Sequence, residues 1–109
     1  MSRQVTIARL YALEGREEAA LALLRRAQTA THAEPGCRLY ALHVDAADPR
    51  AFVFVEIWDD ADAFDSHIAS PHVQELIASS DGVFTGPPEI QTLDPLPHGH
   101  ALKGAVRGE

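Results

Sequence analysis

The spacing of hydrophobic positions changes along the chain, and these changes predict alternating strands and helices. Residues 5–13 are rich in β-branched and apolar side chains and stop at a Glu-Gly pair, which is typical of a strand followed by a turn. From Arg16 the apolar residues recur every three to four positions, which indicates a long amphipathic helix. We expect this helix to end near Glu34-Pro35-Gly36, because Pro35 disfavours helical backbone in the residue before it. The apolar stripe of this helix consists of Ala20, Leu21, Leu24, Ala27 and Thr31.

The remaining chain predicts a hairpin, two short helices and a last strand. Residues 37–45 and 51–58 have strand patterns, and the turn between them contains Asp48-Pro49. Asp59-Asp60 and then Ser70-Pro71 are start signals for two helices in tandem, which we expect to run to Gly82. Residues 88–94 form the last predicted strand. The inward positions of the two helices are Phe64, His67 and Ile68, then Val73, Leu76 and Ile77.

This order of elements, βαββαβ with a broken second helix, predicts an α+β fold. It is the ferredoxin-like arrangement, an antiparallel sheet with helices on one face, and it occupies residues 1–95. Residues 96–109 have little periodicity, and we expect a tail that is loose or docked on a partner subunit.

The strand at residues 51–58 is apolar on both faces. Phe52, Phe54 and Trp58 alternate along it with Val53, Val55 and Ile57. Because helices cover only one face of such a sheet, the second face predicts packing against another subunit. We therefore expect a homodimer.

Composition narrows the class of protein. The 109 residues are 46% apolar, which suits one core, and the formal charge of −7 with scattered basic residues argues against nucleic acid and membrane surfaces as partners. The chain contains neither an apolar run of membrane-spanning length nor the pattern of a signal peptide, so we expect a cytoplasmic protein. The single cysteine, Cys37, excludes an internal disulfide and a metal cage built from thiols alone.

Three residues are candidates for chemistry. His67 lies on an inward helical stripe, where apolar neighbours favour the neutral ring, a competent base; a buried structural histidine is the alternative. Glu56 is a carboxylate within an apolar strand, on the face of Phe54 and Trp58, and needs a partner or a function there. His72 follows His67 by five positions, a spacing that does not place both rings on one helical face, so we expect no metal. Glycine-rich nucleotide motifs and a nucleophile elbow are absent from the sequence.

Three segments together resemble the antibiotic biosynthesis monooxygenase family, close to its quinol monooxygenase members. They are Glu34-Pro35-Gly36-Cys37-Arg38-Leu39-Tyr40, Glu56-Ile57-Trp58 and His67-Ile68-Ala69-Ser70-Pro71-His72, and the likeness spans residues 5–95. The resemblance implies a dimeric α+β barrel. It also implies oxidation of a quinol, an anthrone or a similar phenolic aromatic by molecular oxygen, without flavin, haem or metal.

The resemblance also suggests roles for individual residues. It implies His67 as the catalytic base or a substrate-orienting group, Trp58 and Phe54 as the pocket wall, and His72 or Tyr40 as a hydrogen-bond partner. Glu56 and Phe64 complete the expected substrate-binding set. Three alternatives stay open, namely an isomerase of small carbonyl compounds, a non-enzymatic dimer that binds apolar ligands, and a haem-degrading monooxygenase. The haem-degrading relatives use an Asn on the first strand, and this chain contains no Asn.

Overall fold

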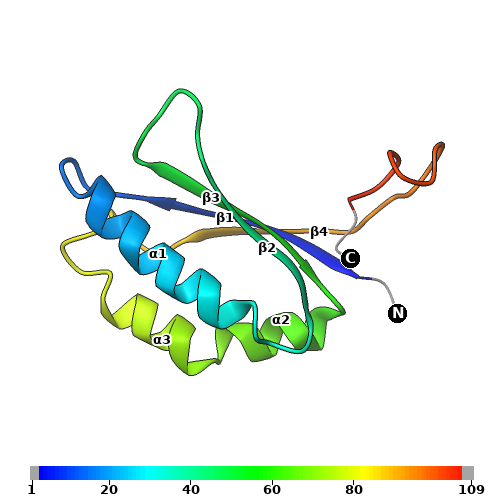
Figure 1. Ribbon diagram of the computed structural model, residues 1–109, viewed down its shortest axis with the longest axis horizontal. Helices are drawn as coiled ribbons and strands as arrows, with labels where there is room; N and C mark the ends of the chain where they lie inside the picture. Colours follow the sequence, from blue (N-terminus) through cyan, green and yellow to red (C-terminus); the bar gives the residue numbers. More distant parts are fainter. Residues whose placement is uncertain (1–2, 107–109) are drawn as a thin grey trace.

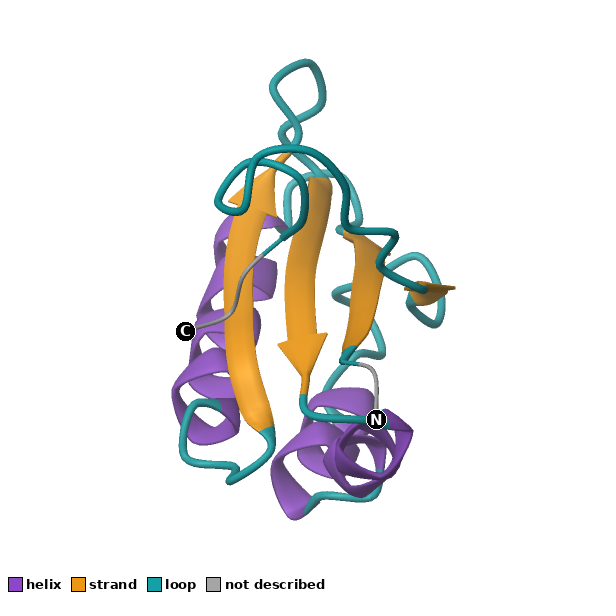
Figure 2. Ribbon diagram, turned by 90° about the vertical axis from the view of Figure 1, so that its right-hand side faces the viewer, coloured by secondary structure: helices purple, strands orange, loops and turns teal. Residues whose placement is uncertain are grey.

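Four strands form one antiparallel sheet in the computed structural model, which describes residues 3–106. The strand order is β2-β3-β1-β4, and Figure 2 shows the strands side by side in this order from left to right. The predicted ferredoxin-like α+β architecture is confirmed. The elements in chain order are β1 (Gln4–Tyr11), α1 (Glu17–Thr31), β2 (Cys37–Val44), β3 (Ala51–Trp58), α2 (Ala61–Ile68), α3 (Pro71–Ala78) and β4 (Glu89–Leu93).

All three helices lie on one side of the sheet (Figure 1). Strand β3 is central, and the register pairs Thr6 of β1 and Tyr40 of β2 with its Glu56. Because side chains alternate along a strand, the row Phe52, Phe54, Glu56 and Trp58 faces the helices. The predicted stripe of α1 packs on this row, with Ala20, Leu24, Ala27 and Thr31 buried.

The opposite face of the sheet carries no helix. Val53 and Val55 are only partly buried there, whereas Ile57 is fully buried. Tail residues Pro95, Pro97, Ala105 and Val106 line a cavity of about 250 Å³ together with Ile57. In the single chain this face is therefore buried only at Ile57, near the tail, while Val53 and Val55 stay partly exposed; burial of the whole face by a second subunit stays a prediction. Figure 1 shows the tail, in orange and red, at the end of the sheet where the N-terminus lies and on the side away from the helices.

Several boundaries differ from the sequence predictions. Helix α1 ends at Thr31, so Glu34 lies in the following turn, and α3 ends at Ala78 rather than near Gly82. The prediction that Ile77 points inward is wrong, because Ile77 is 51% exposed while Val73 is buried. Helix α3 packs on α1 through one narrow side, which leaves Ile77 outside.

The tail has no helix or strand between residues 95 and 106. Its large aliphatic side chains are exposed, with Leu96 at 88% and Leu102 at 62%. The predicted tail also includes residues 107–109, which lie outside the described residues. Within residues 3–106, no helix has the length and apolarity that crossing a membrane requires.

Candidate active site

A closed cluster of aromatic rings lies between the sheet and α2, and it contains most of the predicted site residues. Tyr40 stacks on Phe54 with ring centroids 4.2 Å apart, and His67 lies 4.5 Å from Trp58 and 5.2 Å from Tyr40. Phe64 of α2 lies at 6.2 Å from both Trp58 and His67. Strands supply three of these rings and one helix supplies the other two, as the sequence periodicity predicts.

Burial of the cluster is nearly complete. Trp58 and Phe54 are 0% and 1% exposed, and His67 and Tyr40 are 3% and 5% exposed. The rings therefore pack against one another between β3 and α2 and shield His67 from most of the solvent. A substrate needs a side chain to move before it can contact His67.

The carboxyl group of Glu56 is buried within the same cluster, as its strand position predicts. Its exposed fraction is 2%, and its Oε1 accepts a hydrogen bond of 2.9 Å from Trp58 Nε1. Burial raises the pKa of Glu56 to about 7, although the Trp58 hydrogen bond acts in the opposite direction. Glu56 can therefore exist in either protonation state near neutral pH.

His67 is bonded to a residue that the sequence analysis did not select. Its Nδ1 lies 2.8 Å from Oε2 of Glu34, and Nε2 of His72 lies 2.6 Å from the same oxygen. In the sequence, Glu34 is marked only as part of the turn predicted to end the first helix. The available signal was that Glu34 opens the first of the three family-like segments.

Two tight local contacts bring Glu34 and the histidines together. Gly36 packs so closely on α2 that a Cβ atom at this position would lie 2.4 Å from Cβ of Ala63. The Gly36 carbonyl also accepts a hydrogen bond of 2.9 Å from the Asp59 backbone amide. At the junction of α2 and α3, the Ser70 side chain caps α3 and its hydroxyl donates to the His67 carbonyl at 2.6 Å.

The chain therefore bends between His67 and His72, and both rings reach one carboxylate although they belong to different helices. As predicted, the spacing of five does not place the two rings on one helical face. The bend that lets them share a partner is not predictable from this spacing. The ring centroids are 6.1 Å apart.

His72 lies on the outer side of Glu34, away from Trp58. It lines a groove of about 120 Å³ between α1 and α3, together with Arg26, Glu75 and Leu76. The structure thus places Tyr40, Phe54, Glu56, Trp58, Phe64 and His67 in one cluster and puts His72 behind it.

Burial has opposite effects on the pKa values of the two central ring groups. It lowers the pKa of His67, and this effect exceeds the upward effect of the hydrogen bond and negative charge of Glu34. It raises the pKa of the Tyr40 phenol, so Tyr40 stays protonated and can donate a hydrogen bond. Burial likewise raises the pKa of the nearby Cys37 thiol to about 11, which makes it a poor nucleophile at neutral pH.

Donor atoms of Glu34, His67 and His72 lie within 4.8 Å of one another, a grouping that could also hold a metal ion. Both nitrogens, however, lie at direct hydrogen-bond distance from a single oxygen, 2.6 and 2.8 Å. Ligands of one tetrahedral ion at ~2.0 to 2.1 Å are separated by roughly 3.3 Å. The observed spacing is therefore that of two N–H groups donating to one carboxylate oxygen.

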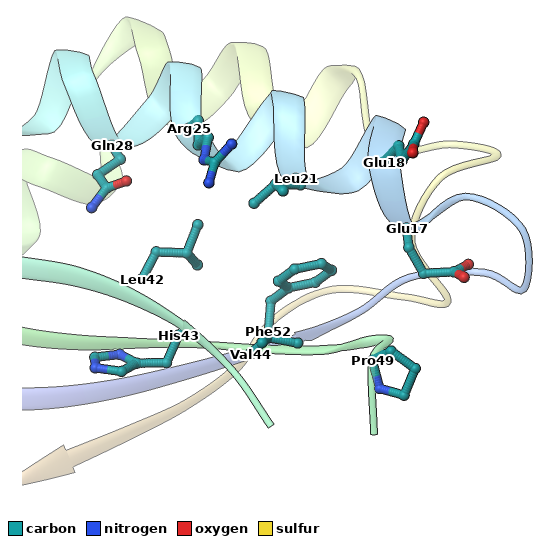
Figure 3. A pocket seen from close by; sticks show the side chains of 10 residues that line it. All are labelled: Glu17, Glu18, Leu21, Arg25, Gln28, Leu42, His43, Val44, Pro49 and Phe52. Atoms are coloured by element: carbon teal, nitrogen blue, oxygen red, sulfur yellow. The ribbon is translucent and has the colours of Figure 1, made fainter. Parts of the chain in front are cut away.

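A larger groove lies elsewhere on the same side of the sheet. Its volume is about 430 Å³, and Figure 3 shows Leu21, Leu42 and Phe52 between α1 and the strands, with Arg25 and Gln28 on the helix above them. Phe52 is six residues from Trp58 along β3, or about 20 Å at ~3.3 Å per residue. The other end of the groove is lined by Leu42, which pairs with Phe54, and by Gln28, whose Nε2 donates to the Tyr40 carbonyl at 3.1 Å, so the groove extends from Phe52 toward the aromatic cluster.

Comparison with known proteins identifies the family. The family model described as antibiotic biosynthesis monooxygenase matches residues 3–79, which include the whole aromatic cluster and both histidines. The chain belongs to the antibiotic biosynthesis monooxygenase family. The resemblance noted from the three sequence segments is thereby confirmed.

Two individual proteins are similar to this chain in sequence, and one of them, Rv0793, is named a putative monooxygenase. The chain is 36% identical over 90 residues to Rv0793 of Mycobacterium tuberculosis, which covers 83% of this chain and 88% of that protein. It is 31% identical over 61 residues to the uncharacterized protein sll1783 of Synechocystis, but that match spans 56% of this chain and only 42% of the relative.

Solved structures of the family have the same fold. The structure of Rv0793 superposes with a TM-score of 0.81 at 32% identity, over 91% of this chain and 100% of that one. The crystal structure of PA3566 from Pseudomonas aeruginosa gives a TM-score of 0.82 at 28% identity, over 88% of this chain and 96% of that one. These two proteins share nearly the entire described fold with this chain.

Proposed function

We propose that this family member is a cofactor-independent monooxygenase that oxidises a quinol, an anthrone or a similar phenolic aromatic with molecular oxygen. The observation that carries the proposal is the environment of His67. Its imidazole is buried against the rings of Tyr40, Trp58 and Phe64, and a carboxylate holds one of its two nitrogens. Such a ring is suited to accept a proton from a flat aromatic molecule.

The chemistry requires deprotonation first, because triplet oxygen reacts slowly with closed-shell molecules. His67 takes a phenolic or acidic C–H proton, and the resulting anion transfers one electron to oxygen. Recombination at carbon forms a peroxide anion, which regains the proton from His67. For an anthrone, loss of water from this hydroperoxide converts CH₂ into C=O, so the substrate supplies every electron that oxygen receives.

The surrounding residues assist this reaction in distinct ways. Trp58 and Phe54 provide flat apolar walls, and Tyr40 donates a hydrogen bond to a substrate oxygen. Exclusion of water by the closed rings strengthens these polar contacts and protects the radical pair from solvent. Phe64 is only half-buried, and we propose that its movement on α2 admits the substrate.

We further propose that the active form is a homodimer. The half-exposed Val53 and Val55 lie on the sheet face without helices, and the exposed aliphatic side chains of the tail include Leu96 and Leu102. An uncovered apolar sheet face favours association with a second copy. In this dimer, the tail would lie next to the partner subunit or pack directly against it.

The oxygen-uptake experiment described below also distinguishes three other functions. They are an isomerase of small carbonyl compounds, a binding protein for apolar molecules, and a haem-degrading enzyme. The haem alternative has the least support, because the haem-degrading relatives use an Asn on the first strand. Here the helix-facing residues of β1 opposite Glu56 and Phe54 are Thr6 and Ala8.

Oxygen uptake by the metal-stripped protein tests the proposal. We expect consumption above the autoxidation rate with a naphthohydroquinone or an anthrone, and no change when a chelator is present. Isomerisation of a carbonyl substrate without oxygen would replace the proposal with an isomerase. Saturable binding of aromatics without turnover would indicate a binding protein, and reductant-dependent loss of bound haem absorption would indicate haem degradation.

A further inference from the structure

We propose that Glu34 is the positioning residue for His67, and that His72 supports this positioning by holding the same carboxylate. This inference rests on the proposed function, in which His67 is the base. It assigns Glu34 and His72 to a second layer behind the reacting group, in place of a direct contact between His72 and substrate.

The hydrogen bonds determine which nitrogen of His67 can react. An ionised Glu34 only accepts hydrogen bonds, so at 2.8 Å the Nδ1 of a neutral His67 must carry the proton. The lone pair is then on Nε2, which makes no hydrogen bond to any of residues 3–106. Glu34 thereby presents an unprotonated nitrogen for proton transfer and stabilises the imidazolium that forms.

His72 fixes the orientation of the carboxylate from the other side. Its Nε2 donates to the same Oε2 at 2.6 Å, and its ring side chain is 22% exposed while that of His67 is 4% exposed. Glu34 is itself shielded, with a side-chain exposure of 15%. Two donors on one oxygen of a shielded carboxylate leave it little freedom to rotate away from His67.

Other titratable groups surround His67 without contacting Glu34 through a hydrogen bond. Tyr40 packs against the ring from β2, and Glu56 lies behind Trp58 on β3. Both face the ring from the sheet side, whereas Glu34 and His72 face it from the turn and α3. The two sides can therefore be changed separately.

Nitrogen-15 NMR of the imidazole rings tests the proposal without any substrate. We expect the neutral wild-type His67 to be protonated at Nδ1. Glu34→Gln should lower the pKa of His67, because the upward effect of the Glu34 charge is lost, whereas His72→Ala should raise it by removing a like charge. Glu75→Gln is the matched control, since Glu75 is an exposed carboxylate that pairs with Arg26 outside the cluster.

Kinetics on the same variants separate positioning from simple stability. Glu34→Gln should lower kcat/KM by about 10- to 10²-fold, the usual cost of losing a partner that orients a reacting group, with a smaller loss for His72→Ala. The acid limb of the pH profile should move to lower pH together with the pKa of His67. Glu34→Asp should recover part of the rate, because it restores the charge.

Protonation of neutral wild-type His67 at Nε2, or an unchanged His67 pKa in Glu34→Gln, would overturn the inference. These spectra also distinguish it from the proposed function. The expected tautomer and pKa changes, combined with no oxygen uptake by the wild type, would contradict the oxygenase proposal while the positioning by Glu34 stands.

Discussion

The two faces of the sheet differ in what they bury. The face toward the helices carries Thr6 and Glu56 at 0% and 2% exposure, and His67 of α2 packs over it at 3% exposure. The opposite face carries Val53 and Val55, which are apolar and yet only half-buried. On the helix side, burial of the polar groups shifts their pKa values. On the opposite face, the partly exposed valines offer an apolar surface that a second copy of the chain can cover. One sheet thereby separates the residues proposed for chemistry from those proposed for assembly.

The largest expected effect concerns assembly. Val55→Asp should convert the proposed dimer into monomer or precipitate, because it places a charge at the centre of an apolar interface. Sedimentation velocity measures this directly. Ile77→Asp is the matched control, since Ile77 is 51% exposed on the helical side and should leave the assembly unchanged. A Val55→Asp protein that remains a dimer would show that the subunits associate elsewhere.

A smaller effect should appear in stability on the helix-covered face. The folded-state pKa of Glu56 is raised from 4.5 to about 7, so the folded protein holds a proton that the unfolded chain releases. The contribution of Glu56 to the free energy of unfolding is fully present below pH 4.5 and is lost as the pH rises through 7. At ~1.4 kcal/mol per pKa unit, the loss is about 3 kcal/mol.

Glu56→Gln tests this sign, because glutamine keeps the acceptor for Trp58 Nε1 and does not ionise. Relative to wild type, the variant should gain free energy of unfolding between pH 5 and pH 8. Urea denaturation at both values measures the gain, and the exposed Glu18→Gln variant should show none. An equal difference at the two pH values would mean that Glu56 does not titrate in this range.

The smallest effect is expected where the turn after α1 meets α2. Gly36→Ala introduces a Cβ 2.4 Å from that of Ala63, and such overpacking typically costs ~1 to 3 kcal/mol. The turn should move and carry Glu34 away from His67, so the rate of oxygen uptake should fall more than the melting temperature suggests. Gly86→Ala is the control, because a Cβ at Gly86 meets nothing within 4 Å. A rate unchanged by Gly36→Ala would show that the spacing of this turn is unimportant for His67.

Local sequence signals were sufficient to predict most of the fold. The change of period at Arg16, the start signals at Asp60 and Ser70, and the two apolar strands of the hairpin each predict an element that the structure contains. Ile77 was misassigned because periodicity defines a stripe without showing how much of it a neighbour covers. The tail residues that line a cavity together with Ile57 could not be predicted, because the tail lacks periodicity and its position depends on tertiary structure alone.

The candidate site was predictable where it depends on strand parity and helix spacing. Glu56 and Trp58 share a face because they are two residues apart, and Phe64 and His67 because they are three apart. Glu34 could not be placed in this way. Its contact with His67 joins residues 33 positions apart and depends on the close approach of Gly36 to α2.

The central claim is that His67 acts as the base of an oxygenase that needs no metal. Its most direct test measures oxygen uptake and thermal melting of His67→Ala and wild type, both stripped of metal, from pH 5 to 9. The rate should fall by about 10²- to 10⁴-fold in a folded protein, and His67→Gln should be as slow. The wild-type rate should decline only at pH values below the ordinary histidine pKa of ~6.5, because burial lowers the pKa of His67. A stable His67→Ala protein with a near-normal rate would contradict the account.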